Sequence, residues 1–287
     1  MKCRHLMNIG ILVGLFTLGC ASSSNGSSGT TGQIIALKTR AEVNGDLTQA
    51  KTNALGWSIA ISEAYLSVGP LYYFAGDPVL SQRHVDTSPL QYALSTVGDW
   101  LVKPAHAHPG HYIAGAAMGE MLTPTTLNLL AGSVDLADGD GVTGSTNSAK
   151  FTWQSPPKGE LAAALEGHVV LVKGVATQGS STIHFIAKAD EPEVHDGDDK
   201  AEVAGCAFGP SPGGSGVNMD GNGTVTLTLS PSVWFDEVDF SYVAPGGDAG
   251  ARAPDASGVV DIAGTLAWEG FIRGVKKGTG YEFSYVK

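Results

Sequence analysis

Gly223-Thr224-Val225-Thr226-Leu227-Thr228-Leu229 is the stretch of this chain that decides the fold. Apolar and polar side chains alternate along it, and a period of two places each set on its own face of a β-strand. Similar alternation recurs from Ile34 to Val43 and from Trp57 to Val68, with Gly, Asp, Asn and Pro at the breaks. Short alternating runs between turn residues are typical of all-β folds. We therefore predict an all-β chain, a β-sandwich of the immunoglobulin-like or cupredoxin-like kind with little helix.

The second half of the chain supports this class. A hairpin is expected from strands at 167–175 and 181–187, which turn at Gly179. Three separate strands are expected at 233–242, 258–268 and 281–286. No helix alternates with these strands, which argues against a fold built of βαβ units. Residues 77–130 are less regular and rich in proline, with a short helix expected around 115–122. We expect this region to be an irregular insertion, and long irregular segments are often functional.

The N-terminus carries an export signal. Lys2 and Arg4 precede an apolar run that ends at Gly19, and this run is too short to span a bilayer. Thr17-Leu18-Gly19-Cys20 resembles the lipobox of bacterial lipoproteins, although leucine stands one position later than in the usual pattern. The resemblance implies a signal peptide at 1–19 and a lipidated Cys20, with palmitate among the lipids, that anchors the chain to the membrane. The alternative is an ordinary secretory signal that happens to contain a cysteine.

The residues after Cys20 fit an anchored protein. Residues 20–33 are rich in serine and glycine and are expected to form a flexible tether. By the same resemblance, Ala21 after the cysteine implies the outer membrane, on either its periplasmic or its surface face. The remainder, 34–287, is expected to form a single domain.

Charge and cysteine content narrow the function classes. The net charge of −11 and the lack of a basic stripe argue against nucleic acid as a partner and favour metal cations. Of the three cysteines, Cys3 lies in the signal and Cys20 is the expected lipid site, so no internal disulfide is expected after processing. Cys206 is interpreted as a small buried apolar residue, with a reactive thiol or a metal ligand as the alternatives.

The strongest local motif is a histidine cluster at His106, His108 and His111. In an extended segment His106 and His108 face the same side, and the Pro109-Gly110 turn can bring His111 beside them. Three imidazoles suit copper or zinc. Further candidate ligands are His84, Met118, Glu120 and Met121. The alternative is a solvated loop whose histidines form only local hydrogen bonds.

A second motif is the acidic, glycine-rich run that contains Asp135, Asp138 and Asp140. Closely spaced carboxylates on such a turn can bind Ca²⁺ through oxygen ligands, although the spacing is not that of an EF-hand. Asp-Gly pairs are equally ordinary in hairpin turns.

These motifs together predict a binding role. The leading hypothesis is an envelope lipoprotein, not an enzyme, that binds copper or zinc through its histidine cluster. A zinc hydrolase is disfavoured because no His-Glu-x-x-His motif occurs. The alternative is a structural or adhesive module that binds a glycan or an envelope protein.

Overall fold

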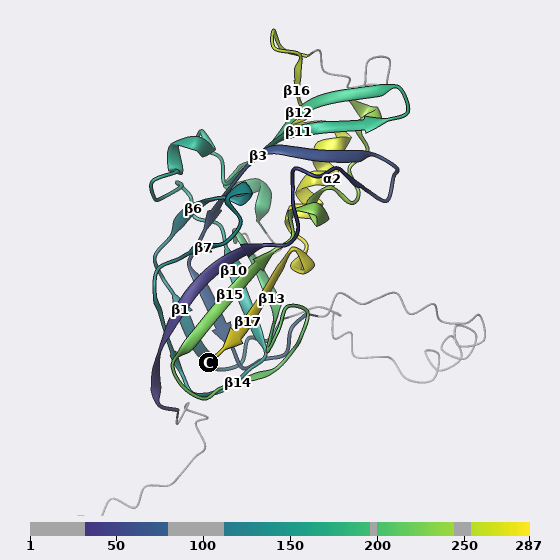
Figure 1. Ribbon diagram of the computed structural model, residues 1–287. Coiled ribbons are helices and arrows are strands. Elements are labelled where there is room, and N and C mark those ends of the chain that lie inside the picture. Colours follow the sequence, from purple (N-terminus) through teal and green to yellow (C-terminus); the bar gives the residue numbers. More distant parts are fainter. Residues whose placement is uncertain (1–31, 80–111, 196–199, 244–253) are drawn as a thin grey trace, which may run out of the picture.

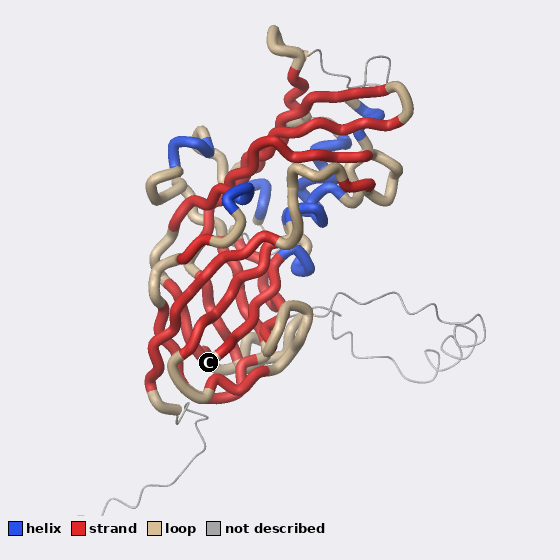
Figure 2. Tube along the Cα trace, viewed as in Figure 1, coloured by secondary structure: helices blue, strands red, loops and turns tan. Residues whose placement is uncertain are grey.

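The computed structural model describes residues 32–79, 112–195, 200–243 and 254–287. Within them the chain forms a large curved sheet, a second sheet beyond one end of it, and a small two-stranded sheet (Figures 1 and 2). The small sheet pairs β9, Gly144–Thr146, with β14, Val217–Met219.

The large sheet closes on itself as a barrel of eight strands. In order around the ring the strands are β15 (Gly223–Leu229), β17 (Tyr281–Val286), β13 (Glu202–Gly209), β10 (Ser148–Thr152), β4 (Leu71–Phe74), β5 (Ala117–Met121), β8 (Gly139–Val142) and β1 (Ile34–Val43). Parallel pairing of β1 with β15 closes the ring, from Leu37 opposite Gly223 to Val43 opposite Leu229. β7, Val134–Asp135, pairs with β1 beyond the end of β8.

This closure corrects the expected sandwich, in which two open sheets would lie face to face. The reason lies in the pairing, not in the strands themselves. A period of two gives one buried and one exposed face in a sandwich and in a barrel alike. β1 runs over Ile34–Val43 as predicted, with Ile35, Leu37, Thr39 and Ala41 buried and the intervening residues exposed.

Aromatic side chains fill the barrel. Tyr73 lies 5.3 Å from Phe208 and 6.0 Å from Phe283, measured between ring centroids. Phe151 lies 4.5 Å from Tyr281 in the same way. All five side chains are fully buried. Eight strands enclose a space just wide enough for such side chains, so the barrel interior is a packed core.

The second sheet has the strand order β16-β12-β11-β3-β2, and β6 also pairs with β3. Its strands are β16 (Val259–Asp261), β12 (Ser181–Ala189), β11 (Val170–Gln178), β3 (Ser58–Val68), β2 (Lys51–Thr52) and β6 (Thr125–Asn128). β11 and β12 form the predicted hairpin, with Gln178 opposite Ser181. β3 leads directly through Gly69 and Pro70 into β4, so a two-residue link joins the second sheet to the barrel here.

Helical turns pack on one face of the second sheet (Figure 1). They are η4 (Pro231–Phe235), η5 (Phe240–Tyr242) and α2 (Leu266–Val275). The remaining short helical turns are η1 (Leu129–Ala131), η2 (Ala162–Leu165), η3 (Glu191–Val194) and η6 (Gly278–Gly280). Phe235 joins this layer together, because its ring lies 5.5 Å from Phe185 of the sheet and 5.3 Å from Phe271 of α2.

Three expectations about local structure were wrong. Residues 233–242 form η4 and η5, and the run at 258–268 holds only the short β16 before α2 begins. Thr265 caps α2 by accepting a hydrogen bond from Trp268 N at 3.2 Å, and the buried Ala267, Phe271 and Val275 recur every fourth residue as in a helix. Conversely, the helix expected at 115–122 is strand β5, held between β4 and β8.

The two ends of the barrel differ. β1 begins at the end away from the second sheet and runs toward it, so Ile34 lies at the far end of the barrel (Figure 1). Among the described residues, no helix has the length and apolarity needed to cross a membrane.

Candidate functional site

The predicted lipid site and the histidine cluster cannot be placed. Cys20, His84, His106, His108 and His111 lie outside the residues that the structure describes. Their roles therefore remain predictions from the sequence.

The three other candidate ligands can be placed on β5. Met118 and Met121 are buried, at 4% and 0% exposure, and belong to the hydrophobic core. Glu120 between them is exposed. Both thioethers therefore contribute to the core, and the proposed role of Met118, Glu120 and Met121 as further metal ligands stays a prediction.

The histidine-bearing segment is bordered by two anchored residues. Val79 N donates to Gly205 O at 3.0 Å, and the Tyr112 hydroxyl lies 2.9 Å from Ser148 Oγ. A Cβ built on Gly205 would lie 2.7 Å from Val79 Cγ2 and 3.1 Å from Tyr112 Cδ2. Both borders of the segment therefore meet at one point on the barrel wall, beside β10 and β13.

The acidic run predicted to bind calcium lies along the outside of β1. Asp138 Oδ2 lies 2.6 Å from Lys38 Nζ, and Asp135 Oδ1 lies 2.8 Å from Arg40 Nε. Asp140 is exposed on β8. The described residues contain no group of three His, Cys, Asp or Glu side chains placed to hold a metal. Two of the three carboxylates thus already have cationic partners.

Cys206 is buried at 1% exposure, in agreement with its interpretation as an apolar residue. Burial raises the pKa of its thiol to about 12. Its Sγ donates to Val203 O at 3.3 Å. A thiol that stays protonated in the core is a poor nucleophile and a poor metal ligand.

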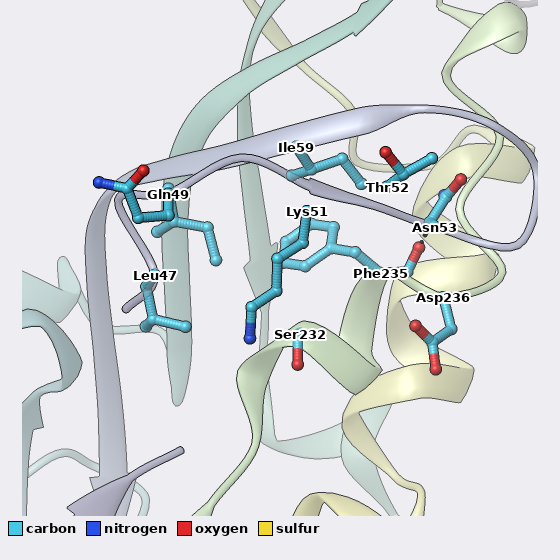
Figure 3. A pocket seen from close by; sticks show the side chains of 10 residues that line it. Leu47, Gln49, Lys51, Thr52, Asn53, Ile59, Ser232, Phe235 and Asp236 are labelled. Atoms are coloured by element: carbon cyan, nitrogen blue, oxygen red, sulfur yellow. Dashed lines mark hydrogen bonds between the residues drawn. The ribbon is translucent and has the colours of Figure 1, made fainter. Parts of the chain in front are cut away.

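The described part of the chain contains a pocket that the sequence did not indicate. It has a volume of about 160 Å³ and opens between the β2–β3 edge of the second sheet and η4 (Figure 3). Its apolar lining comes from side chains that are 2–6% exposed, namely Leu47, Ile59, Ile61 and Phe235. Its polar lining comprises Gln49, Lys51, Thr52, Asn53, Ser232 and Asp236.

Two side chains of opposite charge, Lys51 and Asp236, line this pocket. Lys51 points toward the side of the pocket where Ser232 lies, and Asp236 lies on the other side of Ser232 (Figure 3). Both side chains are exposed. Neither makes a hydrogen bond or ion pair with any other described residue, so both remain available to a ligand.

Asn53 holds the pocket walls together. Its Nδ2 donates to Phe235 O at 2.9 Å and to Val238 O at 2.8 Å. Its Oδ1 accepts from Leu55 N at 3.0 Å and from Trp57 N at 2.9 Å. Because all these groups are used, Asn53 fixes the pocket shape and is not itself free for a ligand.

A lysine and a serine side chain both line this pocket. Lys51 and Ser232 share it, yet no hydrogen bond joins them, so the arrangement does not activate the serine as a nucleophile. No signal in the sequence pointed to this site, since its residues come from three separate stretches with no motif in common.

Comparisons with protein-family models, with curated proteins and with solved structures found no match to this chain.

Proposed function

We propose that this chain is a lipid-anchored envelope protein, held in the outer membrane, that binds copper or zinc through His106, His108 and His111. The observation that carries the proposal is the spacing of these three imidazoles within six residues. Such a spacing lets one ion be held by neighbouring side chains, and imidazole nitrogen suits both metals. The proposed role is binding without catalysis.

The surrounding structure supports this proposal in two ways. The barrel interior is filled by aromatic side chains, which leaves ligand binding to loops and surfaces. Tyr112, directly after His111, is fixed by its contact with Ser148 and by its ring, 6.2 Å from that of Phe74. The cluster therefore adjoins a fixed point on the barrel.

The proposed anchor also fits the fold. A flexible tether of the length of residues 20–33 has an end-to-end distance of roughly 20 Å. It joins the barrel at the start of β1, the end away from the second sheet.

The test is isothermal titration of the mature exported protein with Cu²⁺ and with Zn²⁺. His108→Ala should weaken binding at least about tenfold, since it removes one of three chelating groups. His195→Ala is the matched control, because His195 is engaged by Glu191 at 2.6 Å. Binding should fade below about pH 6, where imidazoles with an ordinary pKa near 6.5 take up protons. Equal affinity in the His108→Ala and unaltered proteins would refute the proposal.

A deletion variant gives an independent check. Because Val79 and Tyr112 meet at Gly205, a short Gly-Ser bridge can replace residues 80–111 while β4 and β5 stay paired. This variant should keep the thermal stability of the barrel and lose metal binding. Retained metal binding would place the ions elsewhere on the chain.

A second candidate is the adhesive module that binds a glycan or a protein. It is favoured by a hollow of about 540 Å³ on the face of the second sheet opposite α2. Lys173, Lys188 and Asp261 are among its lining residues, with Ile186 and Val259 between them. Failure of metal binding, with Lys188→Ala reducing adhesion to envelope material, would favour this candidate.

A further inference from the structure

The pocket under β2 has the construction of a binding site. Its apolar floor comes from the loop before β2, from β3 and from η4, so elements far apart in the sequence form it together. Two hydrogen bonds from Asn53 Nδ2, to Phe235 O and Val238 O, tie the strand side to the η4 side, and Asn53 Oδ1 accepts two more within the β2–β3 turn. Trp57 Nε1 adds another tie by donating to Asp239 Oδ1 at 3.0 Å. These contacts fix the shape of the pocket before any ligand arrives, which lowers the cost of binding.

The volume of the pocket suits a small ligand. A cavity of about 150 Å³ lined by aliphatic and aromatic side chains holds a molecule as large as benzene. The 160 Å³ here are therefore enough for a molecule of about six to nine non-hydrogen atoms.

The charges specify the chemistry further. Lysine often covers an apolar surface with its stem while its ammonium stays in water, and Lys51 lines the same pocket as the apolar Phe235. That role alone does not account for Asp236, which places a carboxylate at the same cavity with no partner among the described residues. The two charges form no ion pair with each other. A ligand that carries both signs would satisfy both groups at once.

We propose that this pocket binds a small zwitterion with an aliphatic body, the chemistry of an aliphatic amino acid. The ligand carboxylate lies at the Lys51 ammonium and accepts a hydrogen bond from the Ser232 hydroxyl. The ligand ammonium lies at Asp236. The aliphatic part packs on Leu47 and Phe235. This site is separate from the histidine cluster, so the proposal stands independently of metal binding.

Four probes test the charge requirement on the mature protein by isothermal titration or by ligand-observed NMR. Leucine and 5-aminopentanoate carry both charges at different separations, 4-methylpentanoate lacks the ammonium, and 3-methylbutylamine lacks the carboxylate. At least one zwitterion should bind about tenfold more tightly than both singly charged probes, as expected for one charged hydrogen bond. Binding by neither zwitterion, or equal binding of all four probes, would overturn the proposal.

Two variants test the assigned residues. Lys51→Gln should weaken binding of the preferred zwitterion about tenfold and leave binding of 3-methylbutylamine unchanged. Asp236→Asn should also weaken binding of the zwitterion about tenfold, but leave binding of 4-methylpentanoate unchanged. The matched controls are Lys276→Gln and Glu160→Gln, which alter exposed residues outside the pocket. Because all four positions are exposed, the variants should keep the parent Tm. Equal loss in a control and in its matched pocket variant would show a nonspecific charge effect and refute the site.

Discussion

Two tyrosines of the barrel should respond in opposite ways to loss of their hydroxyl groups. Tyr73 and Tyr281 are both fully buried. The Tyr281 hydroxyl donates to Val275 O at 2.8 Å. The Thr39 hydroxyl lies near enough to that of Tyr73 to offset part of the rise that burial causes in the Tyr73 pKa, yet neither oxygen meets the geometry of a hydrogen bond with any described residue. The pair therefore offers one chemical change in two settings that differ in hydrogen bonding.

The expected magnitudes follow from these contacts. A buried hydroxyl without a partner costs about 1–3 kcal/mol, so Tyr73→Phe should raise the free energy of unfolding by about 1 kcal/mol. Tyr281→Phe should lower it by about 1 kcal/mol, the net value of one ordinary hydrogen bond. For a chain of this size each change corresponds to a Tm shift of about 2–4 °C, upward for Tyr73→Phe and downward for Tyr281→Phe.

Urea unfolding followed by tryptophan fluorescence measures both effects. The midpoint should move in opposite directions in the two variants while the slope m stays constant, which shows that stability alone has changed. If Tyr73→Phe is destabilised by more than about 1 kcal/mol, the Tyr73 hydroxyl does have a partner, and the reasoning fails. Thr39→Val should then be destabilised as well.

Three further predictions concern stability in acid, reactivity of the Cys206 thiol and packing at Gly141 in the barrel wall. Hydrogen bonds from Ser241 and Trp57 lower the pKa of Asp239 despite the opposing effect of its partial burial. The carboxylate therefore contributes stability above its unfolded pKa near 3.9, and this is lost as the pH falls through the folded value. Between pH 5 and 3 the unaltered protein should lose more stability than Asp239→Asn in urea titrations, and equal losses would contradict this. Cys206 should react with a thiol reagent only in denaturant, because its thiol is buried with a pKa of about 12, and rapid labelling of the folded protein would oppose that. Gly141→Ala should destabilise the protein by about 1–3 kcal/mol, since the added Cβ would lie 2.9 Å from Leu37 Cδ1, and an unchanged denaturation midpoint would show that the wall can yield.

The strands of the barrel wall were the most predictable part of the fold. β1 and β15 each combine strict alternation with flanking turn residues, so both could be located from local pattern alone. The pairing of β1 with β15 could not be predicted, because the residues of a strand do not specify which strand distant in the sequence will pair with it. The stretch at 258–268 was misassigned because its apolar residues fit a short strand as readily as the first turn of α2.

The pocket was beyond the reach of sequence reasoning for a related reason. Lys51 stands in a polar stretch and Ser232 follows a proline, and neither position carries a motif. Only the packing of η4 against β3 brings them to one cavity. The histidine cluster is the opposite case, since its signal is the local spacing of three residues.

Closure of the barrel by β1 and β15 has a consequence for how the chain reaches its native state. Leu37 pairs with Gly223, far away in the sequence, and the last strand, β17, is also part of the ring. Contacts so distant in sequence require large loops to close before they yield stability, which slows folding. A chain that emerges N-terminus first would present β1 with an unpaired edge until most of the remaining residues had followed. Unpaired edges invite aggregation, so this protein should depend on a holding chaperone during its synthesis or export, and truncation before β15 should leave it unable to fold.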